Sequence, residues 1–158
     1  MKIPKGLIIK KSRNGKGIFA NKNFLPEKKI FQITGKLITC YEDDELDEEV
    51  RSNAIPYDKT RYINPAGQLG NFINHSCEPN AKVVKEKKKL FVVSIKPIVK
   101  EEELFFDYST ILAADDVWEM QCNCGTPKCR IVVKKFKTLP KKLRESYIQQ
   151  GMVPNYIL

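Results

Sequence analysis

The sequence predicts a mostly β fold with a minor helical part, made of several small sheets and one helix near the carboxy terminus. Short runs rich in β-branched and aromatic residues recur along the chain, and glycine, proline and asparagine separate them. Helix signals are scarce, and the clearest lies beyond residue 138. There is no internal repeat and no low-complexity linker.

The expected strands are short and follow one another through turn residues. The first four are Leu7–Lys11, Gly17–Ala20, Ile30–Thr34 and Leu37–Tyr41, separated by Asn14-Gly15, Pro26 and Gly35. Further along, Val83-Val84 and Leu90–Ser94 flank the lysine-rich run Lys85–Lys89, a pattern typical of a β-hairpin with a charged turn. Leu104–Phe106 is long enough for one more short strand.

One helix is expected near the carboxy terminus, at about residues 139–150. Pro140 suits a first helical turn, and Leu139, Leu143 and Tyr147 recur at a spacing of four residues. Gly151 can close the end of this helix. The acidic segment around Asp44 to Arg51 is a second, weaker helix candidate.

The size of the chain fits one domain over residues 1–158. A chain of 18.2 kDa is large enough to form a hydrophobic core that is stable without cross-links. No stretch approaches the roughly 20 apolar residues of a membrane span, and Met1–Lys5 leads into a strand-like run, unlike a signal peptide. We expect a cytoplasmic or nuclear protein with no membrane contact, although secretion as an effector through other signals would leave no trace.

Charge is unevenly distributed along the chain. The formal net charge is +9, but Glu42 to Glu49 holds seven carboxylates in eight residues, which leaves +16 on the rest. This pattern favours two electrostatic surfaces, one suited to polyanions such as nucleic acid and one suited to a basic peptide. The alternative is that both are simply solvated faces.

The five cysteines indicate a metal site. In a chain without an export signal, cysteines are more often reduced or metal-bound than disulfide-bonded. Cys122, Cys124 and Cys129 cluster, and a structural zinc site requires a fourth ligand. From the residues alone the fourth ligand is Cys77, Cys40 or His75, the only histidine. Cys40 ends an apolar strand and is the best candidate for a buried free thiol.

Four motifs together resemble the SET-domain protein lysine methyltransferases that carry a post-SET zinc segment. The motifs stand in the order typical of that family: Asn14-Gly15-Lys16-Gly17-Ile18-Phe19-Ala20, Asn74-His75-Ser76-Cys77-Glu78-Pro79-Asn80, Glu103-Leu104-Phe105-Phe106-Asp107-Tyr108, and Cys122-Asn123-Cys124 to Cys129-Arg130. The resemblance covers about residues 7–133. It implies a SET core at about 5–110 with a carboxy-terminal pseudoknot, a post-SET zinc segment at about 118–133, and the helix beyond it.

The resemblance also implies a set of functional residues. Tyr108 would be the catalytic tyrosine, and Phe106 would leave room for a partly methylated amine, so that di- or trimethylation is expected. Zinc would be structural and held by Cys77, Cys122, Cys124 and Cys129. S-adenosylmethionine would be bound by Lys16, Gly17, Ile18, Asn71, Phe72, Asn74, His75 and Tyr108.

Two residues depart from the family pattern. Asn71 stands where many relatives have arginine, so the cofactor carboxylate would need another partner, such as a lysine. Ile33 replaces a tyrosine that often belongs to the lysine channel, which affects the expected rate and not the fold.

Three functions are compatible with the sequence. The first is an S-adenosylmethionine-dependent lysine N-methyltransferase acting on a basic protein such as a histone or a histone-like protein. The second is a catalytically weak SET relative that serves as an interaction module. The third is a zinc-stabilised protein that binds nucleic acid, which the charge supports but which leaves Tyr108 and Asn74-His75 unexplained.

Overall fold

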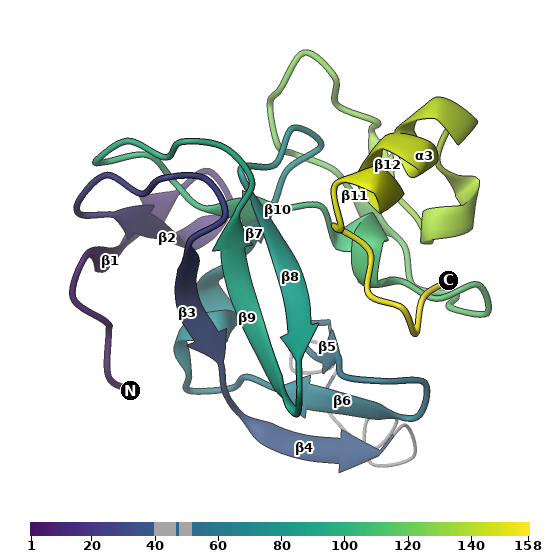
Figure 1. Ribbon diagram of the computed structural model, residues 1–158, viewed down its shortest axis with the longest axis horizontal. Coiled ribbons are helices and arrows are strands. Elements are labelled where there is room, and N and C mark those ends of the chain that lie inside the picture. Colours follow the sequence, from purple (N-terminus) through teal and green to yellow (C-terminus); the bar gives the residue numbers. More distant parts are fainter. Residues whose placement is uncertain (40–46, 48–51) are drawn as a thin grey trace.

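Small β-sheets dominate the protein. The computed structural model describes residues 1–39, 47 and 52–158, and in these residues a single α-helix lies near the carboxy terminus (Figure 1). The predicted mostly β fold class is therefore confirmed. Cys40 and the candidate helix at 44–51 lie outside the described residues, as does the acidic run Glu42–Glu49 apart from Asp47, which is exposed.

The strands fall into five small sheets within the described chain. Their bounds are β1 Leu7–Ser12, β2 Gly15–Ala20, β3 Lys29–Ile33, β4 Lys36–Thr39, β5 Ile55–Pro56, β6 Arg61–Asn64, β7 Asn74–His75, β8 Ala81–Glu86, β9 Lys89–Ser94, β10 Phe105–Phe106, β11 Met120–Gln121 and β12 Val132–Val133. The described residues also form three 3-10 turns and one α-helix: η1 Leu69–Phe72, η2 Tyr108–Ile111, η3 Phe136–Thr138 and α3 Lys141–Gln149.

The central sheet has the strand order β3-β9-β8, and both pairs of neighbouring strands are antiparallel. Alternate residues of these strands enter the main core, where Leu90, Val92 and Val83 are almost fully buried. The predicted β8–β9 hairpin is present. Glu86 pairs with Lys89, so the charged turn is shorter than expected and consists of residues 87 and 88.

The β1–β2 hairpin lies on the β3 side of the central sheet (Figure 1). Its second strand is tied to the chain that enters β10, because the Leu104 N–H donates to the Ile18 carbonyl at 2.8 Å and the Ala20 N–H donates to the Glu102 carbonyl at 2.9 Å. These bonds fix Glu103 beside the glycine-containing start of β2.

The short strands β7 and β10 form a parallel pair, in which Asn74 is the partner of Phe105 although the two lie far apart in the sequence. The Ser76 N–H donates to the Phe106 carbonyl, and the Asn80 N–H donates to the Phe105 carbonyl. The Asn80 side chain accepts from the Phe105 N–H in return. Residues 74–80 therefore form hydrogen bonds with both residues of β10.

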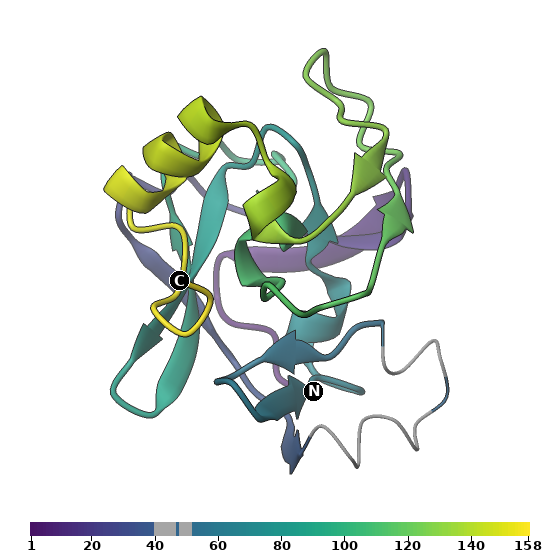
Figure 2. The ribbon, with the colours of Figure 1, turned by 90° about the vertical axis from the view of Figure 1, so that its right-hand side faces the viewer.

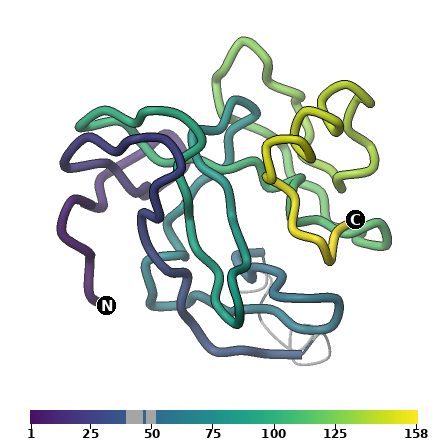
Figure 3. Tube along the Cα trace, viewed as in Figure 1, coloured from purple at the N-terminus to yellow at the C-terminus, as the bar shows by residue number. Residues whose placement is uncertain are grey.

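The carboxy-terminal part has its own apolar cluster. Helix α3 and the β11–β12 pair lie on the β8 side of the central sheet (Figure 2). After α3 the chain turns back along β8 (Figure 3), and the Tyr156 hydroxyl donates to the Pro56 carbonyl of β5 at 2.5 Å. The cluster comprises Phe136, Leu139, Tyr147, Met152, Val153 and Ile157.

The helix begins two residues later than the sequence predicts. Leu139 is extended (φ −64°, ψ 150°) because the residue before a proline is disfavoured in helical conformation, and Pro140 becomes the N-cap. Gly151 follows the helix with a φ of 60°, as expected of a closing glycine. Within the described residues, none of the helices has the length and apolarity to cross a membrane.

Candidate active site and cysteine cluster

The four predicted cysteines meet at one point, although 45 residues separate Cys77 from Cys122. Their sulfur atoms all lie within 4.8 Å of one another, and the Sγ atoms of Cys77 and Cys122 are 3.7 Å apart. Tetrahedral Zn–S bonds of about 2.3 Å place the sulfurs roughly 3.8 Å apart. The cluster therefore has the dimensions of a zinc site, with Cys77 as fourth member.

The local structure around the cluster explains why the sulfurs converge. Cys77 follows β7, and the other three lie in the loop between β11 and β12. Gly125 has a φ of 71°, which a turn requires and a side chain opposes. Burial raises the pKa of Cys77, and the Arg130 N–H, which points at its sulfur at 3.4 Å, acts in the opposite direction.

His75 joins this cluster to the chain around Tyr108. Its Nδ1 accepts from the backbone N–H of Tyr108 at 3.1 Å, so the ring proton belongs on Nε2, which lies 3.4 Å from the Cys77 sulfur. Burial disfavours the imidazolium and lowers the pKa of His75 to about 4, although Asp107 acts in the opposite direction. With both nitrogens engaged, the side chain is not available as a general base.

Tyr108 starts the η2 turn and is held at both ends. Its hydroxyl donates to the Ile73 carbonyl at 2.8 Å, while its ring lies 4.8 Å from that of Phe106 and 5.3 Å from that of His75. Burial, helped by the charge of Glu103, raises the pKa of Tyr108 far above its usual value. The phenol therefore stays protonated and cannot act as a base near neutral pH.

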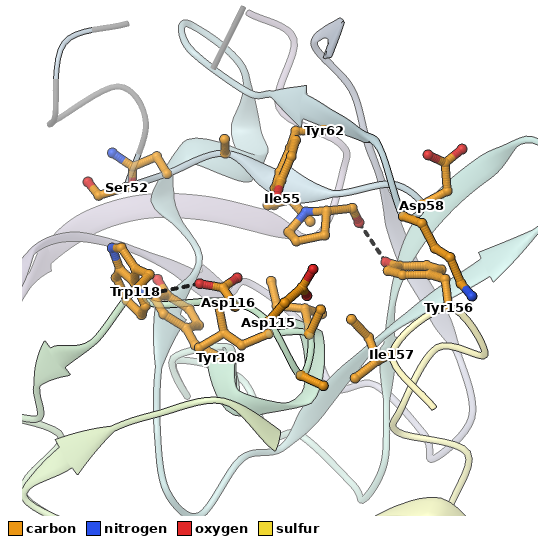
Figure 4. Close-up of a pocket in the computed structure, with 18 of the residues that line it drawn as sticks. Ser52, Ile55, Asp58, Tyr62, Tyr108, Asp115, Asp116, Trp118, Tyr156 and Ile157 are labelled. Atoms are coloured by element: carbon orange, nitrogen blue, oxygen red, sulfur yellow. Dashed lines mark hydrogen bonds between the residues drawn. The ribbon is translucent and has the colours of Figure 1, made fainter. Parts of the chain in front are cut away.

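A cavity of about 880 Å³ opens beside Tyr108 (Figure 4). Phe106 and Ile73 form its apolar wall next to the tyrosine. In Figure 4 Trp118 and Tyr108 lie at one end and Tyr156 at the other, with Asp115 and Asp116 between them. The cavity is thus aromatic near the tyrosine and acidic along its length.

The opposite side of the site is built from β2, β7 and Glu103, which lies two residues before β10. The Asn74 amide donates to the Glu103 carboxylate at 2.8 Å and to the Lys16 carbonyl at 3.1 Å. A Cβ added at Gly17 would overlap the Glu103 carboxylate and lie 3.1 Å from the Asn74 amide nitrogen. Only glycine permits this close approach, so the predicted Lys16, Gly17 and Asn74 form one cradle.

The remaining predicted cofactor residues have structural roles in η1 and in the main core. Asn71 and Phe72 belong to η1, where Phe72 packs against the main core. Ile18 is fully buried in the main core, and its carbonyl accepts from the Leu104 N–H. Ile33 also points into the core, against Gly70, and is not among the residues that line the cavity.

Sequence reasoning missed several residues of the site. Glu103 and Asp107 belong to a recognised motif that predicts no role for them, and nothing in the sequence shows that Ser12 donates to Glu103 at 2.8 Å. Trp118, the only tryptophan, was also missed although its rarity was a signal. Asp115-Asp116 is a further acidic segment, besides Glu42–Glu49, and could have been found in the sequence.

Comparison with known proteins finds a match to one family model and relatives named histone-lysine N-methyltransferases. Residues 15–109 match the family described as SET domain. The chain is 30% identical over 77% of its length to the histone-lysine N-methyltransferase, H3 lysine-36 specific, of Debaryomyces hansenii. It is 31% identical over 80% to the histone-lysine N-methyltransferase Su(var)3-9 of Drosophila pseudoobscura pseudoobscura, and 27% identical over 78% to the histone-lysine N-methyltransferase 2B of Homo sapiens. It spans 18%, 25% and 5% of these three proteins, respectively.

Proposed function

The chain belongs to the SET domain family, and from that premise we propose that it is an S-adenosylmethionine-dependent protein lysine N-methyltransferase. The observation that carries the proposal is the position of Tyr108. Its ring lines the cavity, while its hydroxyl proton is committed to the Ile73 carbonyl. The oxygen lone pairs are then free to accept an N–H from an amine, which orients the amine without removing its proton.

The cradle at Gly17 fits a bound cofactor of positive charge. The Glu103 carboxylate forms no ion pair with any cation of the described chain, so a cationic ligand would complement it. Lys16, Gly17, Asn74 and His75 would hold S-adenosylmethionine, supported by Ile18, Asn71 and Phe72. Bound there, the cofactor supplies a methyl group on a positively charged sulfur. Since Asn71 carries no charge, the exposed Lys16 is our candidate partner for the cofactor carboxylate.

The cavity suits the neutral form of a lysine side chain. Free lysine has a pKa of about 10.4, and transfer into an aromatic environment that excludes water disfavours the ammonium. Phe106 is only 2% exposed and, together with Tyr108, forms this environment. Because Phe106 has no hydroxyl to occupy space beside the amine, di- and trimethylated products are expected.

The acidic residues of the cavity favour a basic substrate such as a histone or a histone-like protein. Asp115 is exposed, and Asp116 is fixed by a hydrogen bond from the Trp118 N–H at 2.8 Å. Burial raises the pKa of Asp116 while the positive charge of Lys135 opposes this. Carboxylates next to the cavity would attract the lysine-rich segments around a target lysine.

We further propose that the four-cysteine cluster holds a structural zinc ion. Four thiolates with no position left for water are the ligand set of a structural site and not of a catalytic one. The ion would fix the loop of residues 122–129 beside β7, next to the cofactor cradle.

The test is methyl transfer from labelled S-adenosylmethionine to a panel of basic proteins and peptides, followed by mass spectrometry of lysines. We expect label on lysine with the wild type. With Tyr108→Phe we expect unchanged cofactor binding and a rate lower by about 100-fold or more, because removing one preorganised hydrogen-bonding group at a reacting centre has an effect of that order.

Other outcomes would identify the alternative functions. Cofactor binding by the wild type without transfer to any substrate would favour a catalytically weak SET relative, a reading that Asn71 supports. A protein that binds no cofactor but binds nucleic acid with an affinity that falls steeply with salt would be a nucleic-acid-binding module.

A further inference from the structure

Asp107 is a buried carboxylate that directly precedes Tyr108 and collects donors from distant parts of the chain. Its Oδ1 accepts from Arg130 Nη2 at 2.7 Å, and its Oδ2 accepts from the Tyr147 hydroxyl at 3.0 Å. Asp107 itself is 1% exposed. Both donors lie beyond residue 109, Arg130 beside the cysteine cluster and Tyr147 on α3, so neither belongs to the part that matches the SET domain family.

The position of this carboxylate determines where the η2 turn begins. Asp107 is the N-cap of η2, and its Oδ1 accepts from the Ser109 N–H at 3.0 Å. The turn starts at Tyr108, so a rotation of the Asp107 side chain would release the Ser109 N–H, which directly follows the tyrosine in the turn. A buried carboxylate is costly unless donors satisfy it, so the donors and the turn geometry depend on each other.

We propose that Tyr147 is a positioning residue for Tyr108, acting through Asp107. The hydroxyl of Tyr147 fixes one carboxylate oxygen and Arg130 fixes the other, so the η2 turn is held from α3 and from the cysteine cluster at once. The proposal rests on the proposed function, because it assigns α3 a part in the reaction through the catalytic role of Tyr108.

The chemistry of Tyr147 suits this role. Burial and the adjacent Asp107 charge both disfavour a phenolate and raise the pKa of Tyr147 well above its usual value, so the hydroxyl remains a donor. The Tyr147 ring packs in the carboxy-terminal cluster. Phenylalanine would keep that packing and remove only the hydrogen bond, which makes Tyr147→Phe a mild substitution.

Lys82 provides a matched control, because it attaches the other end of α3 without contacting Asp107. Its ammonium donates to the Gln150 carbonyl, at the carboxy-terminal end of the helix, at 2.9 Å, and it pairs with Glu27 at 3.0 Å. Lys82 is 8% exposed, so Lys82→Met also removes a buried polar contact. A role for α3 in stability alone predicts the same effect of both variants on activity.

The experiment compares Tyr147→Phe and Lys82→Met with the wild type in thermal unfolding, in kcat and KM for a basic peptide, and in tryptophan emission. Trp118 is the only tryptophan and its ring lies 6.3 Å from that of Tyr108, so its emission reports on this turn. With Tyr147→Phe we expect kcat to fall about tenfold, since small misplacement at a reacting centre has effects of this size or larger, with KM unchanged and the emission altered. Lys82→Met should lower the unfolding temperature but leave kcat and the emission as in the wild type.

Three results would overturn the proposal. They are a kcat for Tyr147→Phe equal to that of the wild type, a loss of kcat in Tyr147→Phe that Lys82→Met matches, and an emission change that is the same in both variants. Should the wild type itself transfer no methyl group, the proposed function fails, and the emission comparison alone then decides whether Tyr147 positions the η2 turn.

Discussion

The two sides of Tyr108 are built in different ways. On the side of β2 and β7, the polar side chains are locked by several partners each. The Asn74 amide has Glu103, Lys16 and Ser12 as acceptors, and Asp107 is bonded by three donors. Both ring nitrogens of His75 are engaged as well.

On the cavity side, the segment of residues 113–118 is held by few polar contacts. Asp115 and Val117 are exposed, and the wall formed by residues 113–118 has one side-chain hydrogen bond, from the Trp118 N–H to Asp116. The tail that forms the far wall is attached to β5 through the hydroxyl of Tyr156.

This difference separates two tasks. A cofactor of fixed shape requires a preorganised cradle, and under the proposed function the locked side would provide it. The cavity side uses exposed charge and apolar surface, which suits a substrate segment that adapts on binding. Changes on the locked side should therefore have large effects on cofactor binding and product, and changes on the cavity side should have small ones.

Loss of zinc should have the largest effect. We expect Cys122→Ser to abolish stoichiometric zinc binding and to lower the free energy of unfolding by about 5 kcal/mol or more, because structural zinc binding is coupled to folding. Cofactor affinity should fall with it, since Cys77 lies two residues from His75. Metal analysis, thermal unfolding and cofactor titration provide the measurements.

The control for this variant is Cys40→Ser, which leaves all four cysteines of the cluster in place. It should retain zinc and cofactor affinity. Unchanged cofactor affinity in zinc-free protein would show that the cluster and the cradle are independent.

Phe106→Tyr should change the product more than the stability. A hydroxyl added beside the amine occupies space, and one extra group in an apolar pocket changes the rate about 10- to 100-fold. We expect di- and trimethylated lysine to decrease by that factor while monomethylated lysine persists. Mass spectra of a wild-type reaction that contain only monomethyllysine would contradict this interpretation of Phe106.

Glu103→Gln tests the charge of the cradle. The single carbonyl oxygen of glutamine can still accept from Asn74, and its NH2 group can donate to the Ser12 hydroxyl, but the variant loses the negative charge that complements a cationic cofactor. We expect cofactor Kd to rise about five- to tenfold, as for other hydrogen bonds that lose an ionised partner. The adjacent Glu102 bonds Asn80 at 2.9 Å and faces away from Gly17, so Glu102→Gln is the control and should leave Kd unchanged. Equal Kd values in the wild type, Glu103→Gln and Glu102→Gln would show that Glu103 does not contribute to cofactor binding.

Local features of the chain were the ones that the sequence could predict. Strands β1, β2, β3, β8 and β9 follow from short apolar runs between turn residues, and their predicted positions are confirmed within one or two residues. The gathering of Cys77 with three distant cysteines was also predicted, but only through resemblance, since spacing alone left Cys40 and His75 as alternatives.

Contacts between distant segments could not be predicted. The bonds from Arg130 and Tyr147 to Asp107 join residues 23 and 40 positions apart, and no periodicity encodes them. The same holds for the cavity, whose walls come from the start of β5, the segment after η2 and the tail. The late start of α3 was predictable in principle, because Pro140 restricts Leu139, but the apolar spacing took precedence in the prediction.

The smallest effect is expected from Asp58→Asn on the cavity side. Asp58 accepts from Arg61 Nε at 3.0 Å and Nη2 at 2.5 Å, and this pairing lowers its pKa against the opposing effect of burial. Because the pKa of the folded state lies below the unfolded value, the stabilisation is present above about pH 4 and is lost as pH falls through the folded-state pKa. The Arg61 side chain of this pair is largely exposed, so the free energy of unfolding of the variant should be lower by only about 0.5 kcal/mol at neutral pH. Denaturant unfolding of both proteins from pH 7 to pH 3 measures this difference, which should shrink toward zero at the acid end. A loss of several kcal/mol at pH 7 would mean that the cavity wall is as tightly held as the cofactor cradle, and the contrast between the two sides of Tyr108 would not stand.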